Sequence, residues 1–243
     1  MTILLSLIVT VVAFFYSSVG FGGATGYLAA MSLFGVPPQV MTSTALVLNI
    51  MTASISFFFR ARQLRFRLLW PFLVTSIPAV FFGGTLKLTD QVYFVLLYSI
   101  LAFVAIQLMF FSKNLDAQIT QVPPIWIALL VGLGIGLLSG MVGIGGGIFL
   151  SPIIILAGWG TSKETSAVTA AFIVLNSISG LVGRVTAGNF AFGEFSLVLI
   201  PFGLIGALAG SYLGSRKLSG ITLRRALGVV MSIAVVNFWI KLF

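Results

Sequence analysis

Long apolar runs follow one another along the chain, separated by short polar or glycine-rich breaks. Runs of about 20 apolar residues are long enough to cross a bilayer as α-helices. In the first half the pattern predicts a helix over 2–19, a short arm near 24–34, and longer helices near 38–59, 68–86 and 91–112. The second half predicts the same order at 125–142, 147–157, 162–185, 194–214 and 222–243. The chain therefore reads as an all-α polytopic membrane protein.

A glycine-rich break follows the first apolar run of each half. Residues 19–26 read VGFGGATG, and residues 142–149 read VGIGGGIF. Non-helical backbone at membrane depth is tolerated only where protein or water surrounds it. We therefore expect both breaks inside the bundle, where glycine permits positive φ angles and close approach of a ligand. The glycines within 132–136, with Gly203, Gly206 and Gly210, are instead assigned to close helix packing.

The two breaks belong to an internal duplication. They align at an offset of 123 residues, and MTSTALVLN at 41–49 aligns with VTAAFIVLN at 168–176 at an offset of 127. Two matches in the same order predict a duplicated chain. The repeats are 1–112 and 125–243, joined by a connector at 113–124 within a single integral membrane domain.

The distribution of arginine and lysine predicts that the repeats are inverted. The loop RARQLRFR at 60–67 holds four arginines, whereas its counterpart GNFAFGE at 188–194 has no cation. At the next loop the asymmetry reverses in favour of the second repeat, which has Arg216, Lys217, Arg224 and Arg225. Because cytoplasmic loops collect Lys and Arg, equivalent loops of the two repeats lie on opposite faces of the membrane.

Inversion requires an odd number of crossings in each repeat, and three long helices already supply it. The run and the arm around each break should then begin and end on one side, as a glycine-broken hairpin whose tip reaches the middle of the membrane. At about 1.5 Å per residue, however, the run over 2–19 is nearly long enough to span. A full span with a short compensating span therefore stays open.

The composition removes most enzyme chemistry. The chain is 59% hydrophobic and 7% charged, with a mean hydropathy of +1.19. It contains no cysteine and no histidine, which excludes thiol catalysis, disulfides and imidazole metal sites. We expect no enzyme, no cofactor and no metal site. The formal charge of +9 is assigned to cytoplasmic loops, so no nucleic-acid partner is expected.

The breaks also suggest a ligand. Each short arm begins directly after a break, so its first N–H groups lack helical partners and its dipole favours an anion. Broken helices at matching positions of inverted halves are typical of a transporter's substrate site. Thr42 and Asn49 share one helix face, and Thr169 and Asn176 repeat that face in the second half. These side chains either line a cavity or bond neighbouring helices.

Charged groups are expected at the membrane edges. All four acidic residues lie in predicted loops or at helix starts, which disfavours a proton-relay pump. Arg184 is the cation nearest an apolar interior, and snorkelling to the interface is the favoured interpretation. Binding is therefore assigned to backbone dipoles and neutral side chains rather than to a buried cation.

The second break and the helix after it, SGMVGIGGGIFLSPIIILAGWGTSKETSAVTAAFIVLNSISG, resemble the signature of the sulfite exporter TauE/SafE family, also called the 4-toluene sulfonate uptake permease family. A degenerate copy, YSSVGFGGATGYLAAMSLFGVPPQVMTSTALVLN, occupies the first half. The resemblance covers essentially the whole chain. It implies transport of sulfur-containing or organosulfonate anions, such as sulfite, sulfoacetate or thiosulfate, in a bacterial cytoplasmic (inner) membrane. The first half departs from the pattern at Ala24 and Thr25 and lacks a proline matching Pro152.

The sequence thus predicts a secondary transporter that binds a small anion between the breaks. Transport would proceed by alternating access, in which the site is exposed to one side of the membrane at a time. The candidate substrate-binding residues are the glycines of both breaks and nearby Thr, Ser and Asn residues: Gly20, Gly22, Gly23, Thr25, Thr42, Ser43, Asn49, Gly143, Gly145, Gly146, Gly147, Thr165, Ser166, Thr169 and Asn176. An anion channel with the same site and a non-transporting membrane scaffold are the alternatives. The exact substrate, the direction, the coupling ion (H⁺ or Na⁺) and homo-oligomerisation stay open.

Overall fold

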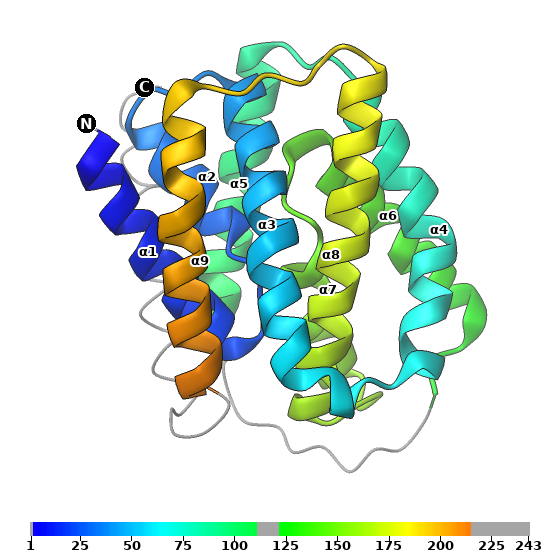
Figure 1. The fold of residues 1–243 in the computed structure, drawn as a ribbon. Helices are drawn as coiled ribbons and strands as arrows, with labels where there is room; N and C mark the ends of the chain where they lie inside the picture. Colours follow the sequence, from blue (N-terminus) through cyan, green and yellow to red (C-terminus); the bar gives the residue numbers. More distant parts are fainter. Residues whose placement is uncertain (1, 111–121, 215–243) are drawn as a thin grey trace.

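The protein is a bundle of helices (Figure 1). The computed structural model describes residues 2–110 and 122–214. In these ranges the elements are α1 (Thr2–Val19), α2 (Ala24–Leu33), α3 (Pro38–Arg60), the 3₁₀ helix η1 (Ala61–Gln63), α4 (Phe66–Thr85), α5 (Asp90–Phe110), α6 (Ile125–Val142), α7 (Gly147–Leu156), α8 (Ser162–Thr186) and α9 (Glu194–Gly214). The predicted all-α class is confirmed. The expected helix over 222–243 and the connector up to residue 121 lie outside the described residues.

Seven of the described helices are long and apolar enough to cross a membrane: α1, α3, α4, α5, α6, α8 and α9. Large apolar side chains also cover the outside of the bundle, where Phe58 is 81% and Trp126 is 65% exposed. In water such a surface would favour association, whereas in a bilayer it faces lipid. The chain is therefore a multi-pass integral membrane protein.

Local signals in the sequence set several helix boundaries. Thr161 forms a capping box at the start of α8, in which its Oγ1 accepts from the Glu164 N–H at 3.3 Å. The Glu164 carboxylate accepts in return from the Thr161 N–H at 2.9 Å. Pro38 occupies the first turn of α3, where its missing N–H leaves no bond unmade. Both features follow from the residue types at the first turn of each helix.

Two helix pairs, α1–α9 and α4–α6, pack along rows of glycines, as expected for small residues at helix interfaces. A Cβ at Gly206, Gly210 or Gly214 of α9 would overlap main-chain carbonyls of α1. A Cβ at Gly132, Gly136 or Gly140 of α6 would overlap main-chain carbonyls of α4. The two pairs are counterparts in the predicted repeats. Gly134 is the exception within 132–136, because it faces open space.

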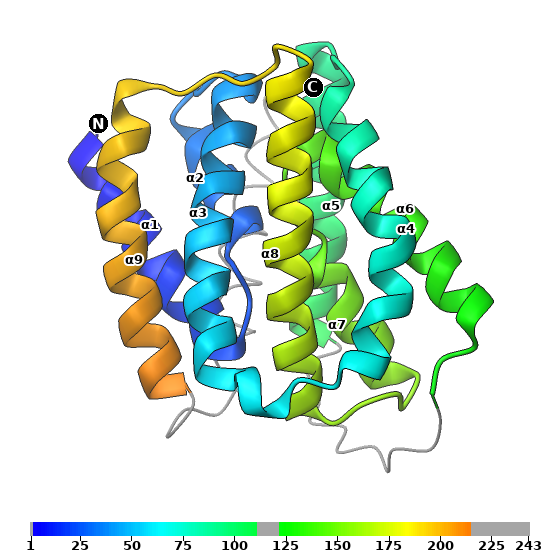
Figure 2. The same cartoon turned by 45° about the vertical axis from the view of Figure 1, so that its right-hand side comes forward.

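α1 crosses the whole bundle instead of turning at its middle. Its last turn lies beside the end of α3, where the buried Arg60 Nη2 donates to the Ser18 carbonyl at 2.8 Å. The chain then turns back, Gly22 reaches Asn49 at the middle of α3, and α2 returns to the side where α3 begins (Figure 2). The expectation that α1 enters only to half depth is therefore wrong, whereas Gly22 of the break reaches the middle of the bundle as expected. The structure instead has a long first helix followed by a short returning helix, the alternative that the sequence left open.

α6 follows the same course from the other side. Its last residue, Val142, accepts from the Tyr93 hydroxyl near the start of α5 at 3.3 Å, and Gly143 lies against Thr42 near the start of α3. α1 and α6 thus end beside opposite ends of α3. This placement agrees with inverted halves, but the inversion also involves the element at 222–243 and stays a prediction.

Candidate functional site

The two glycine breaks come together at the middle of α3. A Cβ placed on Gly145 would lie 2.9 Å from Asn49 Nδ2 and 3.1 Å from Ile173 Cγ2. A Cβ on Gly22 would also lie 3.1 Å from Ile173 Cγ2, and closer still to Asn49 Oδ1. Asn49 Nδ2 donates to the Ile144 carbonyl at 3.0 Å. A side chain of the first half thus holds the break of the second.

Both breaks use backbone angles that only glycine adopts without strain. Positive φ angles occur at Gly20 and Gly23 in the first break and at Gly143, Gly145 and Gly146 in the second. The ten-residue helices α2 and α7 start directly after these glycines, and neither has a side-chain hydrogen bond at its N-cap. The first N–H groups of each helix have no partner within the helix. Each break therefore presents donors and the positive end of a helix dipole.

The first break is held by its own neighbours. The Gly22 carbonyl accepts from the Tyr27 hydroxyl at 2.9 Å, and the Thr52 hydroxyl lies 2.6 Å from the same oxygen. One turn further along, Thr25 Oγ1 lies 2.7 Å from the Tyr16 hydroxyl, also in a buried position. Two tyrosines and two threonines thus form hydrogen bonds here, although Asn49 Oδ1 beside Gly22 has no described partner.

The second break lies among buried polar atoms that have no partner in the part of the chain that the structure describes. These atoms are Ser139 Oγ, Thr169 Oγ1 and Ser177 Oγ, while the unpartnered Asn49 Oδ1 lies against Gly22 of the first break. Ser177 Oγ lies 2.8 Å from a Cβ placed on Gly145, and Ser139 Oγ lies 2.7 Å from one on Gly146. The Thr169 methyl lies 2.7 Å from a Cβ placed on Gly147. An unpaired buried hydroxyl costs about 1–3 kcal/mol, so this cluster is suited to a polar ligand or to water.

The breaks are tightly packed in this conformation. Asn49, Ile173 and Ser177 lie so close to Gly22 and Gly145 that neither position has room for a methyl group. A solute between the breaks would require the surrounding helices to part. The structure therefore corresponds to a closed arrangement of the site.

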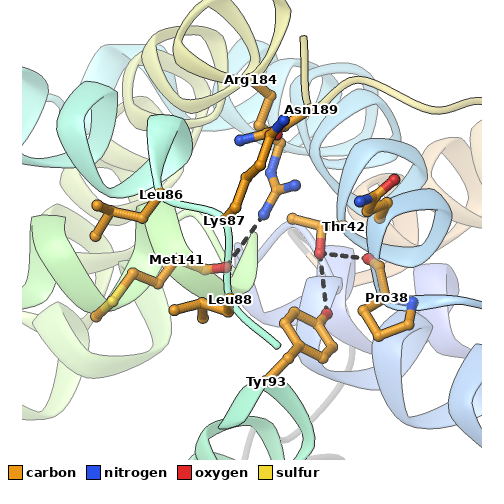
Figure 3. Close-up of a pocket in the computed structure, with 10 residues that line it drawn as sticks. Pro38, Thr42, Leu86, Lys87, Leu88, Tyr93, Met141, Arg184 and Asn189 are labelled. Carbon is orange, nitrogen blue, oxygen red and sulfur yellow. Dashed lines mark hydrogen bonds between the residues drawn. The ribbon is translucent and has the colours of Figure 1, made fainter. Parts of the chain in front are cut away.

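A separate pocket opens where α6 ends, beside the start of α3 and the end of α8 (Figure 3). Its cavity volume is about 20 Å³, so the pocket is narrow. Thr42 Oγ1 donates to the Tyr93 hydroxyl at 3.0 Å, and Arg184 Nη2 donates to the Met141 carbonyl at 3.2 Å. Arg184 is only 5% exposed. The expectation that Arg184 snorkels to the interface is therefore wrong.

The predicted site residues do not all lie together: some lie at the middle of α3 and others lie toward each of its two ends. Gly22, Asn49, Gly145, Gly146, Gly147 and Thr169 lie at the centre. Gly23 lies against the Tyr27 ring, and Thr25 is bonded to Tyr16. Gly20 lies against Ser166, whose hydroxyl donates to the Val19 carbonyl at 2.8 Å, near the end of α1. Gly143 lies against Thr42 at the opposite end of α3.

Three predicted residues have their described contacts elsewhere. Ser43 Oγ accepts from the Ala191 N–H at 3.2 Å, between α8 and α9. Asn176 Oδ1 accepts from the Ser76 hydroxyl of α4 at 3.0 Å. Thr165 is buried and lies near Gly160. The Thr and Asn positions that the repeat equates therefore do not have equivalent neighbours.

Sequence reasoning missed four residues beside these sites: Tyr27, Tyr93, Ser139 and Ser177. Ser139 stands four residues before Gly143, and Ser177 follows Asn176 directly. Serine is common within membrane helices, where it bonds its own backbone, so these positions gave a weak signal. The two tyrosines gave no sequence signal. Tyr93, for example, reaches Thr42 from another helix.

Comparison with known proteins places the chain among membrane transporters. The family model described as "Sulfite exporter TauE/SafE" matches residues 5–238. The chain is 37% identical over 233 residues to probable membrane transporter protein y4hK of Sinorhizobium fredii (strain NBRC 101917 / NGR234), covering 92% of each chain. It is 29% identical over 220 residues to probable membrane transporter protein MJ0441 of Methanocaldococcus jannaschii, covering 84% of this chain and 80% of that relative. No solved structure matches.

Proposed function

The chain belongs to the sulfite exporter TauE/SafE family, and from this premise we propose that it carries small sulfur-containing or organosulfonate anions, of the sulfite, sulfoacetate or thiosulfate class, by alternating access. Membership of the family makes the protein a membrane transporter. The substrate class and the mechanism are the proposal.

The unpartnered hydroxyls around the second break are the observation that carries this proposal. Ser139, Thr169 and Ser177 can each donate to an oxyanion, and the first N–H groups of α7 add main-chain donors. Hydrogen bonds to a charged group contribute about 1.5–3 kcal/mol each, enough to replace part of the hydration of the anion. No acidic side chain lies among the buried residues that the structure describes, so nothing in those ranges repels a negative solute there.

The ends of α1 and α6 offer two gates for alternating access. The end of α1 is closed by Ser166, and the end of α6 is closed by the contacts among Thr42, Tyr93 and Val142. Because these ends lie at opposite ends of α3, opening one would expose the centre to one side only. The centre is closed in this conformation, which favours a carrier over an open channel. Donors on neutral groups hold an anion without trapping it, because no full positive charge lies beside it.

Flux measurements on reconstituted protein test the proposal. We expect saturable uptake of sulfite, thiosulfate or sulfoacetate with counterflow, and at least tenfold weaker apparent affinity in the double variant Ser177→Ala/Thr169→Val. Ser54→Ala removes a hydroxyl that is exposed and bonded within α3, so it serves as the matched control. Unchanged affinity in a folded double variant would contradict the site. Flux without saturation or counterflow would contradict the carrier.

A further inference from the structure

The pocket of Figure 3 has the chemistry of an anion site that is distinct from the glycine breaks. Two cations, Lys87 and Arg184, line it, and no acidic residue does. Neither cation forms an ion pair within residues 2–110 and 122–214. The ion pair in these ranges joins Arg65 and Glu164, at 3.9 Å. The pocket lies at the start of α3, whereas the arginine-rich segment 60–67 lies at its end.

Arg184 is poised to bind a ligand. Its Nη2 is occupied by the Met141 carbonyl, while its buried Nε has no hydrogen-bond partner among the described residues. In Figure 3 the guanidinium reaches down toward Met141, between Lys87 and Thr42. A buried cation without a counter-ion is unfavourable, and an oxyanion that accepts from the guanidinium fork would compensate its charge.

The other polar groups of the pocket narrow the class of ligand. Asn189 is held by a 3.0 Å bond from its Nδ2 to the Thr85 carbonyl, and its Oδ1 is buried without a described partner. That oxygen can accept from the Lys87 ammonium or from the O–H of a monoprotonated oxyanion. The Thr42 hydroxyl completes a polar wall. Two cations and little space favour a small oxyanion over a large organic acid.

We propose that Arg184 and Lys87, with Asn189 and Thr42, form a second anion-binding site that receives a small oxyanion at the membrane face opposite the arginine-rich segment 60–67. The site is next to the gate at the end of α6, because Arg184 holds the Met141 carbonyl and Tyr93 holds the Val142 carbonyl. An anion that draws the guanidinium away from Met141 would loosen this gate. The gating role rests on the proposed transport function, whereas binding in the pocket does not.

Cysteine protection tests the binding directly. The chain has no cysteine, so Gln39→Cys, at an exposed residue that lines the pocket, introduces a single thiol and keeps both cations. We expect saturating methanesulfonate to slow modification of this thiol by an uncharged methanethiosulfonate reagent at least fivefold in the purified full chain. Gln63→Cys, exposed in η1 near the end of α3, is the matched control and should show no protection.

Charge removal identifies the groups responsible. In the Gln39→Cys background, Arg184→Gln should abolish the protection and Lys87→Gln should weaken it. Arg184→Lys keeps the positive charge but lacks the guanidinium fork, so it should retain part of the protection. This variant separates anion binding from a folding defect. Absence of protection in the Gln39→Cys protein, or equal protection after Arg184→Gln, would overturn the proposal. Protection without any transport would support the anion site in the pocket and refute the proposed function. Transport without protection would support the proposed function and refute the anion site.

Discussion

The two glycine breaks are related by sequence yet differ in how their polar surroundings are satisfied. Around the first break, hydroxyls of Tyr27 and Thr52 bond the Gly22 carbonyl. Around the second, the hydroxyls of Ser139, Thr169 and Ser177 are buried without a partner among the described residues. The first break thus has the character of a structural support, whereas the hydroxyls beside the second can bond the proposed ligand once the surrounding helices part.

The difference arises from a few substitutions between the repeats. At the offset of 123 residues, Tyr16 corresponds to Ser139 and Tyr27 corresponds to Leu150. The first half therefore has two phenols that fill space and bond neighbouring polar groups. The second half has a short hydroxyl and an apolar side chain at the same positions. A duplicated fold can in this way use the hydroxyls of one break for structure and leave those of the other for the proposed ligand.

Among the changes that test this comparison, Gly145→Ala should have the largest effect on stability. Its φ of +75° disfavours any L side chain, and its Cβ would lie 2.8 Å from Ser177 Oγ. Left-handed strain and overpacking together predict a loss of roughly 3 kcal/mol. We expect a marked fall in the thermal unfolding temperature of the purified protein and loss of transport.

Gly188→Ala is the control for backbone strain alone. Gly188 has a φ of +66° but no atom within 4 Å of its Cβ position, so only the left-handed strain of about 1–2 kcal/mol applies. If both alanine variants lower the unfolding temperature equally, the second break is not tightly packed.

The double variant Thr52→Val/Tyr27→Phe should have the next largest effect. It leaves the buried Gly22 carbonyl without its two side-chain donors, which predicts a loss of roughly 2 kcal/mol. Substrate affinity should change less than twofold, since the binding donors belong to the second break. Thermal unfolding and equilibrium binding of sulfite on the same preparations check both statements. Ser179→Ala, at the position equivalent to Thr52, removes one partly buried hydroxyl that donates to the Ile77 carbonyl at 2.7 Å, so it should cost only about 1 kcal/mol. A large loss of affinity in the double variant would show that the first break also binds the ligand.

Ser177→Ala should have the smallest effect on stability and a clear effect on binding. The hydroxyl has no described partner, so its removal should leave the free energy of unfolding unchanged or raise it by up to about 1 kcal/mol. We expect three- to tenfold weaker binding of sulfite, measured by titration of the purified protein. Destabilisation by more than about 1 kcal/mol would mean that Ser177 makes a structural bond, which would contradict the contrast between the breaks.

Much of the architecture follows from local properties of the chain. The ends of α1, α3, α6 and α8 lie within one residue of the predicted boundaries, because apolar length, glycine, proline and the capping box act over a few residues. Which polar groups meet could not be predicted in this way. Thr52 reaches Gly22 across 30 residues and Asn49 reaches Ile144 across 95, so both contacts depend on how the helices pack.

The sequence by itself determined the membrane-spanning class, the two glycine breaks and the family, since these depend on hydrophobic length, on residues with unusual backbone freedom and on motif order. Only the tertiary structure decided that α1 crosses the whole bundle, that Arg184 is buried, and that tyrosine and threonine hydroxyls bond the first break while the hydroxyls beside the second have no described partner. Burial and hydrogen-bond satisfaction are properties of neighbours. In a bundle those neighbours come from helices far apart in the chain, so no local pattern encodes them.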